Sequence, residues 1–266
     1  MDWNNTKSIF IMVFFILNVF LLYQFLEKIN DNQYDEFITE SSYEEVLKED
    51  DITIKNPLAK QKVKDQFLIA KSKTFDKKEL KNLKTQKVNI IDGNKLVSSL
   101  KTPISLGKEI KSTDIDLFLK DHILYGSEYG YWSYDKESQT IICYQVTDNK
   151  MFFNNSKGKV TLYLNKEAEV TSYEQTYLVE IKKFNKPKEL YSDLDAVYAL
   201  YSHGDIVSKD EVTDVKLGFY NSLQTTSSSH LLVPTWWVVV NDETDLFVNA
   251  FDGEVIELNT EEKILE

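Results

Sequence analysis

The sequence has no arginine, and it holds only one cysteine, four prolines and eight glycines in 266 residues. All 31 basic residues are therefore lysines, and 43 acidic residues give a formal net charge of −12. Arginine is the side chain that contacts phosphate and guanine through two parallel hydrogen bonds, so its absence from an acidic chain argues against nucleic-acid binding. A single cysteine, Cys143, excludes an intrachain disulfide, and we expect its thiol to be a small core group.

The sequence also lacks the motifs of the common enzyme classes. No Walker loop, dinucleotide fingerprint or nucleophile elbow is present. No pair of histidines has metal-ligand spacing among His122, His203 and His230, and we expect His122 to be structural. The S-x-x-K spacing of penicillin-recognising enzymes begins at Ser98, Ser105, Ser133 and Ser156. It arises readily by chance in a lysine-rich chain, and the K-T-G motif that accompanies it in those enzymes is missing. We therefore expect a protein that is not an enzyme and that has no cofactor or metal site.

One long apolar run lies near the N-terminus, from Ile9 to Leu26, and only three polar side chains interrupt it: Asn18, Tyr23 and Gln24. At about 1.5 Å per residue the run spans roughly 27 Å as a helix, close to the hydrocarbon thickness of a bilayer. No small-residue cleavage site follows, so we expect an uncleaved transmembrane anchor over residues 9–28. Lys7 precedes the run and acids follow it, which predicts that residues 1–8 are cytoplasmic and the remainder extracytoplasmic.

One face of this anchor is a candidate for partner binding inside the membrane. Asn18 lies near its middle, and the residues at spacings of three, four and seven share its face: Ile11, Phe14, Leu22 and Phe25. Burial of apolar groups gives no net drive for helix association in lipid, so a polar amide can decide which helices pair. Asn18 is either bonded to a partner helix or simply tolerated in lipid, and the sequence leaves both open.

Charge is arranged in two blocks after the anchor. Residues 29–54 hold nine acids against Lys48, a net of −8, and residues 55–111 hold fifteen lysines against five acids, a net of +10. Such blocks are usually solvated faces or stalks, and we expect an acidic stalk over residues 29–56. The alternatives are a partner-docking patch on the stalk, a lysine-rich block folded back on it, and a block facing phosphate-bearing wall polymers.

The hydrophobic period beyond the stalk predicts short helices among many strands. The expected helices are Ser42–Leu47, Asp76–Leu83, Thr113–Tyr125 and Leu194–Tyr201. We expect Thr113 to cap the third and Gly126 to end it, and Ser192 or Asp193 to cap the fourth, with Gly204 near its end. The expected strands are Phe67–Phe75, Lys87–Ile91, Lys95–Leu100, Tyr129–Tyr134, Thr140–Val146, Lys159–Leu164, Val170–Val179, Val212–Tyr220, Leu231–Val240, Leu246–Ala250 and Glu254–Leu258.

The order of these elements, a helix and then strands, occurs twice and predicts an α+β fold of antiparallel sheets with packed helices. We expect two similar subdomains, residues 57–108 and 109–266. Near the end of the chain, Trp236 and Trp237 point to opposite faces of one strand. One should pack on the helix Leu194–Tyr201, and the other is either covered by the first subdomain or forms a partner surface.

Several segments together carry a family resemblance. They are Asp2-Trp3-Asn-Asn-Thr6-Lys7 leading into the anchor, Asn154-Asn155-Ser156 with the strands KVTLYLN and VTSYEQTYL, the helix DAVYALY, and Leu217-Gly218-Phe219-Tyr220. In these segments the chain resembles the YycI family of low-GC Gram-positive bacteria over nearly its whole length. The segment from Pro234 to Ile256 is separately similar to the strand–hairpin ending of PepSY-type modules.

The resemblance implies one N-terminal transmembrane helix and an extracytoplasmic domain without enzymatic activity. It further implies two partners: a sensor histidine kinase of the WalK (YycG) type and a YycH-type protein. These belong to the WalK/WalR (YycG/YycF) two-component system, which controls cell-wall metabolism. The chain would then be a membrane-anchored accessory regulator that acts by binding. The alternatives from other classes are an extracytoplasmic enzyme of wall metabolism and a wall-polymer-binding protein.

Overall fold

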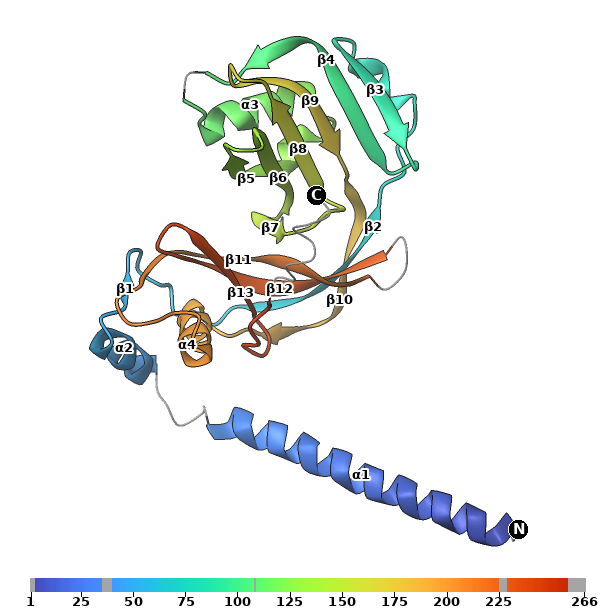
Figure 1. Ribbon diagram of the computed structural model, residues 1–266, viewed down its shortest axis with the longest axis vertical. Helices are drawn as coiled ribbons and strands as arrows, with labels where there is room; N and C mark the ends of the chain where they lie inside the picture. The colour runs from blue at the N-terminus through green and yellow to red at the C-terminus, as the bar shows by residue number, and fades with distance from the viewer. Residues whose placement is uncertain (1–2, 35–39, 108, 225–228, 258–266) are drawn as a thin grey trace. The chain divides into compact units, whose positions relative to one another are not determined.

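The computed structural model describes residues 3–34, 40–107, 109–224 and 229–257, and it divides into two compact units, Met1–Asp51 and Ile52–Glu266 (Figure 1). The first unit contains helices α1 (Trp3–Tyr34) and α2 (Glu40–Glu49). Within α1, Lys7–Leu26 is long and apolar enough to cross a membrane, with a mean hydropathy of 2.5. The expected N-terminal apolar helix is therefore present, and it continues to Tyr34, inside the predicted stalk.

The second unit is an α+β fold, as predicted, and most of its strand pairs are antiparallel. The hydrogen-bonded strand order is β10-β2-β12-β11-β7-β6-β8-β9-β4-β3, with β1 beside β11, β13 beside β12 and β5 beside β6. The elements are β1 (Thr53–Ile54), β2 (Lys64–Ser72), η2 (Glu79–Asn82), β3 (Gln86–Ile91), β4 (Lys95–Ser105), α3 (Ser112–His122), η3 (Gly126–Glu128), β5 (Tyr129–Asp135), β6 (Thr140–Thr147), β7 (Lys150–Phe153), β8 (Lys159–Leu164), β9 (Glu169–Gln175), β10 (Leu178–Glu189), α4 (Asp193–His203), β11 (Glu211–Gln224), β12 (Ser229–Val240) and β13 (Thr244–Asn249).

Strand pairing divides this unit into two lobes that share β7 (Figure 1). The α3 lobe contains α3 with β3, β4, β5, β6, β8 and β9, and the α4 lobe contains α4 with β1, β2 and β10 to β13. Strand β7 pairs antiparallel with β6 and parallel with β11, so its backbone hydrogen bonds tie the lobes together. The predicted boundary between residues 57–108 and 109–266 stays a prediction, and pairing crosses it, since β2 pairs with β12 and β4 pairs with β9.

Helix α3 packs on β5, and Ile115, Phe118 and Leu119 are buried. Its predicted ends are wrong. Lys111 is the N-cap and provides no side-chain cap, and the helix stops at His122. The chain then turns through Tyr125 at φ 56°, and a Cβ on Gly126 would lie 1.7 Å from the carbonyl oxygen of Leu119. Gly126 is thus required by close backbone approach after the helix.

Helix α4 has the ends that the sequence predicts. The Ser192 Oγ accepts a hydrogen bond from the Asp195 backbone N–H at 3.1 Å, and the Asp195 carboxylate accepts one from the Ser192 N–H at 2.7 Å. This reciprocal capping box supplies acceptors for two N–H groups at the helix start. Gly204, at φ 92°, ends the helix in the left-handed conformation that glycine adopts without steric cost.

The single strand predicted over Val170–Val179 is wrong, because the chain changes sheets within it. Strand β9 pairs with β8 and β4 in the α3 lobe, and β10 pairs with β2 in the α4 lobe. At the change, the buried Gln145 side chain accepts from the Leu178 N–H at 2.9 Å and donates to the Leu178 carbonyl at 3.0 Å. The amide of Gln145 therefore satisfies the backbone where the ladder is interrupted.

Three further differences lie in short segments. Strand β7 was not predicted, because its four residues carry too little periodic signal. Strand β2 ends at Ser72 rather than at Phe75. The predicted final strand from Glu254 is only an isolated bridge between Val255 and Val248, and its last residue, Leu258, lies outside the described residues. The chain turns at Gly253 between these segments, and the Gly253 N–H donates to the Asn249 carbonyl at 2.9 Å.

Candidate interaction site

The anchor face proposed for partner binding is apolar and exposed on the isolated helix. The exposed fractions of Ile11, Phe14, Leu22 and Phe25 are 70%, 66%, 56% and 61%. The Asn18 Nδ2 donates to the Phe14 carbonyl oxygen at 2.7 Å, one helical turn back. This bond lowers the cost of placing the amide in lipid, because it gives one N–H an acceptor within the helix. A role for these five residues in partner binding stays a prediction.

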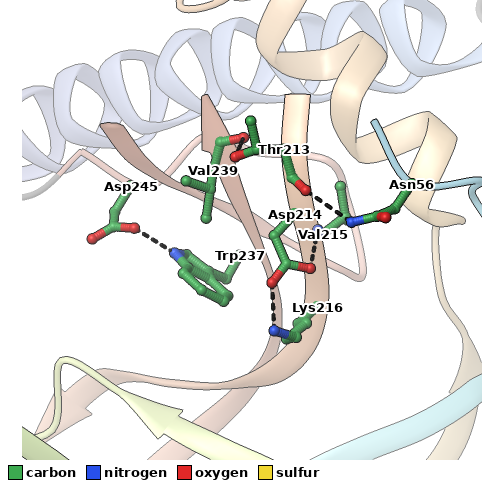
Figure 2. Close-up of polar contacts among 8 residues, drawn as sticks. All are labelled: Asn56, Thr213, Asp214, Val215, Lys216, Trp237, Val239 and Asp245. Atoms are coloured by element: carbon green, nitrogen blue, oxygen red, sulfur yellow. Dashed lines mark hydrogen bonds and ion pairs between the residues drawn. The ribbon is translucent and has the colours of Figure 1, made fainter. Parts of the chain in front are cut away.

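Trp236 and Trp237 lie on opposite faces of β12, as their alternation predicts. Trp236 is buried, with 8% of its surface exposed, and its indole N–H donates to the Tyr191 carbonyl at 2.9 Å, just before α4. Strands β12 and β13 pack against α4. Trp237 is half-buried, and its indole N–H donates to Asp245 Oδ1 at 2.8 Å (Figure 2).

The ring of Trp237 belongs to an aromatic cluster between the lobes. Its ring centroid lies 4.8 Å from that of Trp132 on β5 and 5.9 Å from that of Phe153 on β7. The ring centroid of Phe247 on β13 lies 5.7 Å from that of Phe153. One alternative from the sequence was that the first subdomain, residues 57–108, covers Trp237. The aromatic rings that contact it instead belong to residues 109–266. The missed residue, Trp132, carried no signal, since only the fold brings β5 to β12.

A pocket of about 190 Å³ lies at the start of β11. Its lining includes Ile54, Leu58 and Val215, together with Asp193, the first residue of α4. The Asp193 carboxylate accepts hydrogen bonds from the backbone N–H groups of Ala59 at 2.6 Å and Lys60 at 3.0 Å. A carboxylate with these donors holds the loop after β1 in place, so the role of Asp193 here is structural.

A polar cluster around Glu79 is also structural. Glu79 Oε1 lies 2.9 Å from the Lys73 ammonium and accepts from the Tyr125 hydroxyl at 2.9 Å. The hydrogen bond from Lys73 lowers the pKa of Glu79. Burial acts to lower the pKa of Lys73, but the bonds with Glu79 and Tyr125 outweigh it and raise that pKa. Both groups therefore stay charged near neutrality, whereas a general acid or base needs a pKa near the working pH.

Cys143, His122 and His203 lie in structural surroundings. Burial raises the pKa of the Cys143 thiol, which lies in the core of the α3 lobe, as expected of an inert residue. The His122 ring lies 5.0 Å from that of Phe118, and His203 is bonded to Asp205 at 2.8 Å. Within the described ranges, no group of three or more His, Cys, Asp and Glu side chains could hold a metal ion.

A comparison with protein families gives one match: the family model described as YycI protein matches residues 31–251. A comparison with curated proteins gives no match. The sequence match therefore covers most of the chain beyond the apolar helix.

Among solved structures, an uncharacterized protein from Eubacterium rectale is similar at 10% identity and a TM-score of 0.42, covering 79% of this chain and 92% of that one. The Bacillus megaterium YpeB C-terminal domain is similar at 13% identity and a TM-score of 0.38, covering 83% of this chain and 99% of that one. YycH from Bacillus subtilis is similar at 15% identity and 0.36, covering 72% of this chain and 52% of its own length. These likenesses are distant, so the strand pairing itself defines the fold.

Proposed function

Because the chain belongs to the YycI family, we propose that it is a membrane-anchored accessory regulator of a sensor histidine kinase of the WalK (YycG) type. It binds the kinase together with a YycH-type protein and so modulates the two-component system that controls cell-wall metabolism. It acts by binding rather than by catalysis. The observation that carries this proposal is the family match over residues 31–251.

The apolar helix α1 supports the proposal, because a chain anchored by it would lie in the same membrane as the kinase. Lys7–Leu26 can cross the bilayer once. Lys7 on its leading side and the acids that follow Leu26 orient it with residues 1–8 in the cytoplasm and the second unit outside. Residues 9–28 form the membrane segment. The acidic stalk expected over residues 29–56 overlaps the second unit at its end, because β1 pairs with β11 and Asn56 bonds Thr213. The second unit then lies on the same side of the membrane as the extracytoplasmic part of a sensor kinase.

Contact within the membrane uses the face of α1 that contains Asn18. The carbonyl Oδ1 of Asn18 accepts a hydrogen bond from a polar side chain of a partner helix, while Nδ2 keeps its bond to Phe14. Such a bond is worth roughly 0.6–2 kcal/mol in a bilayer. Ile11, Phe14, Leu22 and Phe25 pack around it. The half-buried Trp237 and its neighbours are a second candidate contact, outside the membrane.

The proposal is tested by co-purification from detergent-solubilised membranes. Cells producing the tagged full-length protein should yield the sensor kinase and the YycH-type protein in stoichiometric amounts. An unrelated single-pass protein with the same tag is the control, and it should recover neither. Recovery of neither partner with the tagged protein would overturn the proposal. Retention of wall polymer instead would favour the polymer-binding alternative.

A further inference from the structure

One edge of β11 has a vacant strand position between β1 and β7. Strand β12 pairs along the other edge of β11, from Val212 to Gln224. On the open side, β1 pairs in parallel at Glu211 and Val212, and β7 pairs in parallel at Phe219 and Tyr220. From Thr213 to Gly218, none of the strands in the described part of the chain pairs with this edge. At about 3.3 Å per residue, the vacant stretch is roughly 17 Å long.

Two side chains occupy ladder positions along this edge (Figure 2). The Asn56 Nδ2 donates to the Thr213 carbonyl at 3.0 Å, and the Asp214 Oδ1 accepts from the Val215 N–H at 3.0 Å. These are the bonds that the N–H and the C=O of a neighbouring strand would make. Because strand residues alternate, the N–H and C=O of Leu217 face the same side as those of Val215. Short polar side chains compete with a ladder in this way and can be replaced by one.

A pocket opens beside the first half of the vacant stretch. It measures about 190 Å³, and its lining combines the apolar residues Ile54, Leu58 and Val215 with the polar residues Asn56, Asp193 and Asp214. A cavity of about 150 Å³ holds a benzene ring, so the volume of this pocket is enough for one aliphatic or aromatic side chain resting on Ile54, Leu58 and Val215. Main-chain hydrogen bonds with pockets for alternate side chains are what an added strand uses for affinity and specificity.

The charge of the edge selects the incoming segment. The Asp214 Oδ2 is paired with Lys216, and its Oδ1 would lose the Val215 N–H if a strand took that donor. A basic side chain on the incoming segment would restore a partner for that oxygen. Asp210 and Glu211 lie at the β1 end of the edge, and Asp242 there is paired with Lys55.

We propose that the edge of β11 from Thr213 to Leu217 accepts an extended segment of a partner protein as an added strand. The segment carries one apolar side chain, which enters the pocket beside Val215, and a lysine or arginine, which pairs with Asp214. In binding, its backbone displaces Asn56 from the Thr213 carbonyl and Asp214 from the Val215 N–H. This inference rests on the proposed function, and it identifies where the extracytoplasmic part of the chain meets one of its two partners.

The test is site-specific photocrosslinking of the full-length protein in membranes that contain both the sensor kinase and the YycH-type protein. The crosslinker p-benzoylphenylalanine is placed at Lys216, whose side chain is 61% exposed. The matched control position is Lys182, on the edge strand β10, with 75% of its side chain exposed. The Lys216 position should crosslink to one linear segment, containing apolar and basic residues, of one of the two partners. The Lys182 position should not reach that segment.

Two variants should change the crosslinking yield in opposite directions. Leu217→Pro removes an N–H on the open edge and leaves the ladder with β12, so crosslinking should fall about tenfold. Asn56→Ala removes the side chain that competes for the Thr213 carbonyl, so crosslinking should rise. Destabilisation of the protein would not increase crosslinking. The rise expected for Asn56→Ala therefore decides the test if Leu217→Pro fails to fold.

Unchanged crosslinking in both variants at equal protein level would overturn the inference. So would crosslinks from Lys216 to a second copy or to residues 258–266 of the same chain. If the wild-type protein recovers both partners but Lys216 crosslinks to neither, the edge is not the contact and the proposed function stands. If the wild-type protein recovers neither partner, the proposed function itself fails.

Discussion

The ring centroid of Trp132 lies 4.8 Å from that of Trp237, with an angle of 49° between the ring planes. Trp132 is on β5 of the α3 lobe, and Trp237 is on β12 of the α4 lobe. The contact therefore adds side-chain packing to the backbone pairing of β7 where the two lobes meet.

A double-mutant cycle should detect this contact. Trp132→Ala and Trp237→Ala, alone and together, should give a coupling energy of about 0.5–1.5 kcal/mol, the range of tilted aromatic pairs. The measurement is urea unfolding of the detergent-solubilised full-length protein. The control pair is Trp132→Ala with Trp236→Phe, which acts on the opposite face of β12 and should show little coupling. Equal coupling in both cycles would contradict the assignment of faces.

Trp236 should be the tryptophan on which stability depends most. Trp236→Ala removes a buried indole and leaves a cavity, which should cost about 3–5 kcal/mol of unfolding free energy, enough to unfold a marginal domain. Trp236→Phe keeps most of the volume but loses the bond to the Tyr191 carbonyl, so it should cost less. Thermal unfolding compares the two variants. Wild-type stability of Trp236→Ala would show that β12 does not lie in a core.

His230 should make the protein less stable in mild acid. It is fully buried, with Nε2 2.9 Å from the Ser72 hydroxyl oxygen, and burial, followed by the charge of Lys157, lowers its pKa below 6.5. The unfolded chain then binds a proton at a higher pH than the folded chain does. Stability due to neutral His230 is present above pH 6.5 and is lost as the pH falls from there towards the lowered pKa. Melting temperature should therefore drop more steeply below pH 6.5 in the wild type than in His230→Gln, and equal slopes would refute the assignment.

Asn18→Leu should weaken binding if the anchor contacts a partner helix. Loss of one intramembrane hydrogen bond of roughly 0.6–2 kcal/mol corresponds to about a 3- to 30-fold fall in association. Crosslinking of full-length protein to the kinase, with reporter output of its regulon, measures the effect. Val19→Leu changes the adjacent face and is the matched control. Unchanged crosslinking and output at equal protein level would confine the contact to the extracytoplasmic unit.

The proposed orientation of the anchor predicts where protease can act. A protease added to intact protoplasts should digest the chain after about residue 30 and leave residues 1–8 protected, because positive charge precedes the apolar run. Lysed protoplasts provide the control in which both ends are cut. Full protection in intact protoplasts would reverse the orientation and remove the second unit from the kinase's extracytoplasmic side.

The site was less predictable than the elements that build it. The sequence identified Trp236 and Trp237 as neighbours on opposite faces, because alternation in a strand is a local property. It did not identify Trp132, Asn56 or Thr213, since their contacts join residues far apart in the chain. No periodic pattern records which strand edge is left without a neighbour.

Local physical chemistry let the sequence determine the apolar helix, the α+β class, the ends of α4 and most strand positions. Each depends on side chains within a few residues of one another. Only the tertiary structure decided that residues 170–179 split between two sheets, that β7 bridges the lobes, and that β11 keeps an open edge. These features depend on which backbone groups find partners across the chain, and the free energy of that choice lies in long-range pairing and packing.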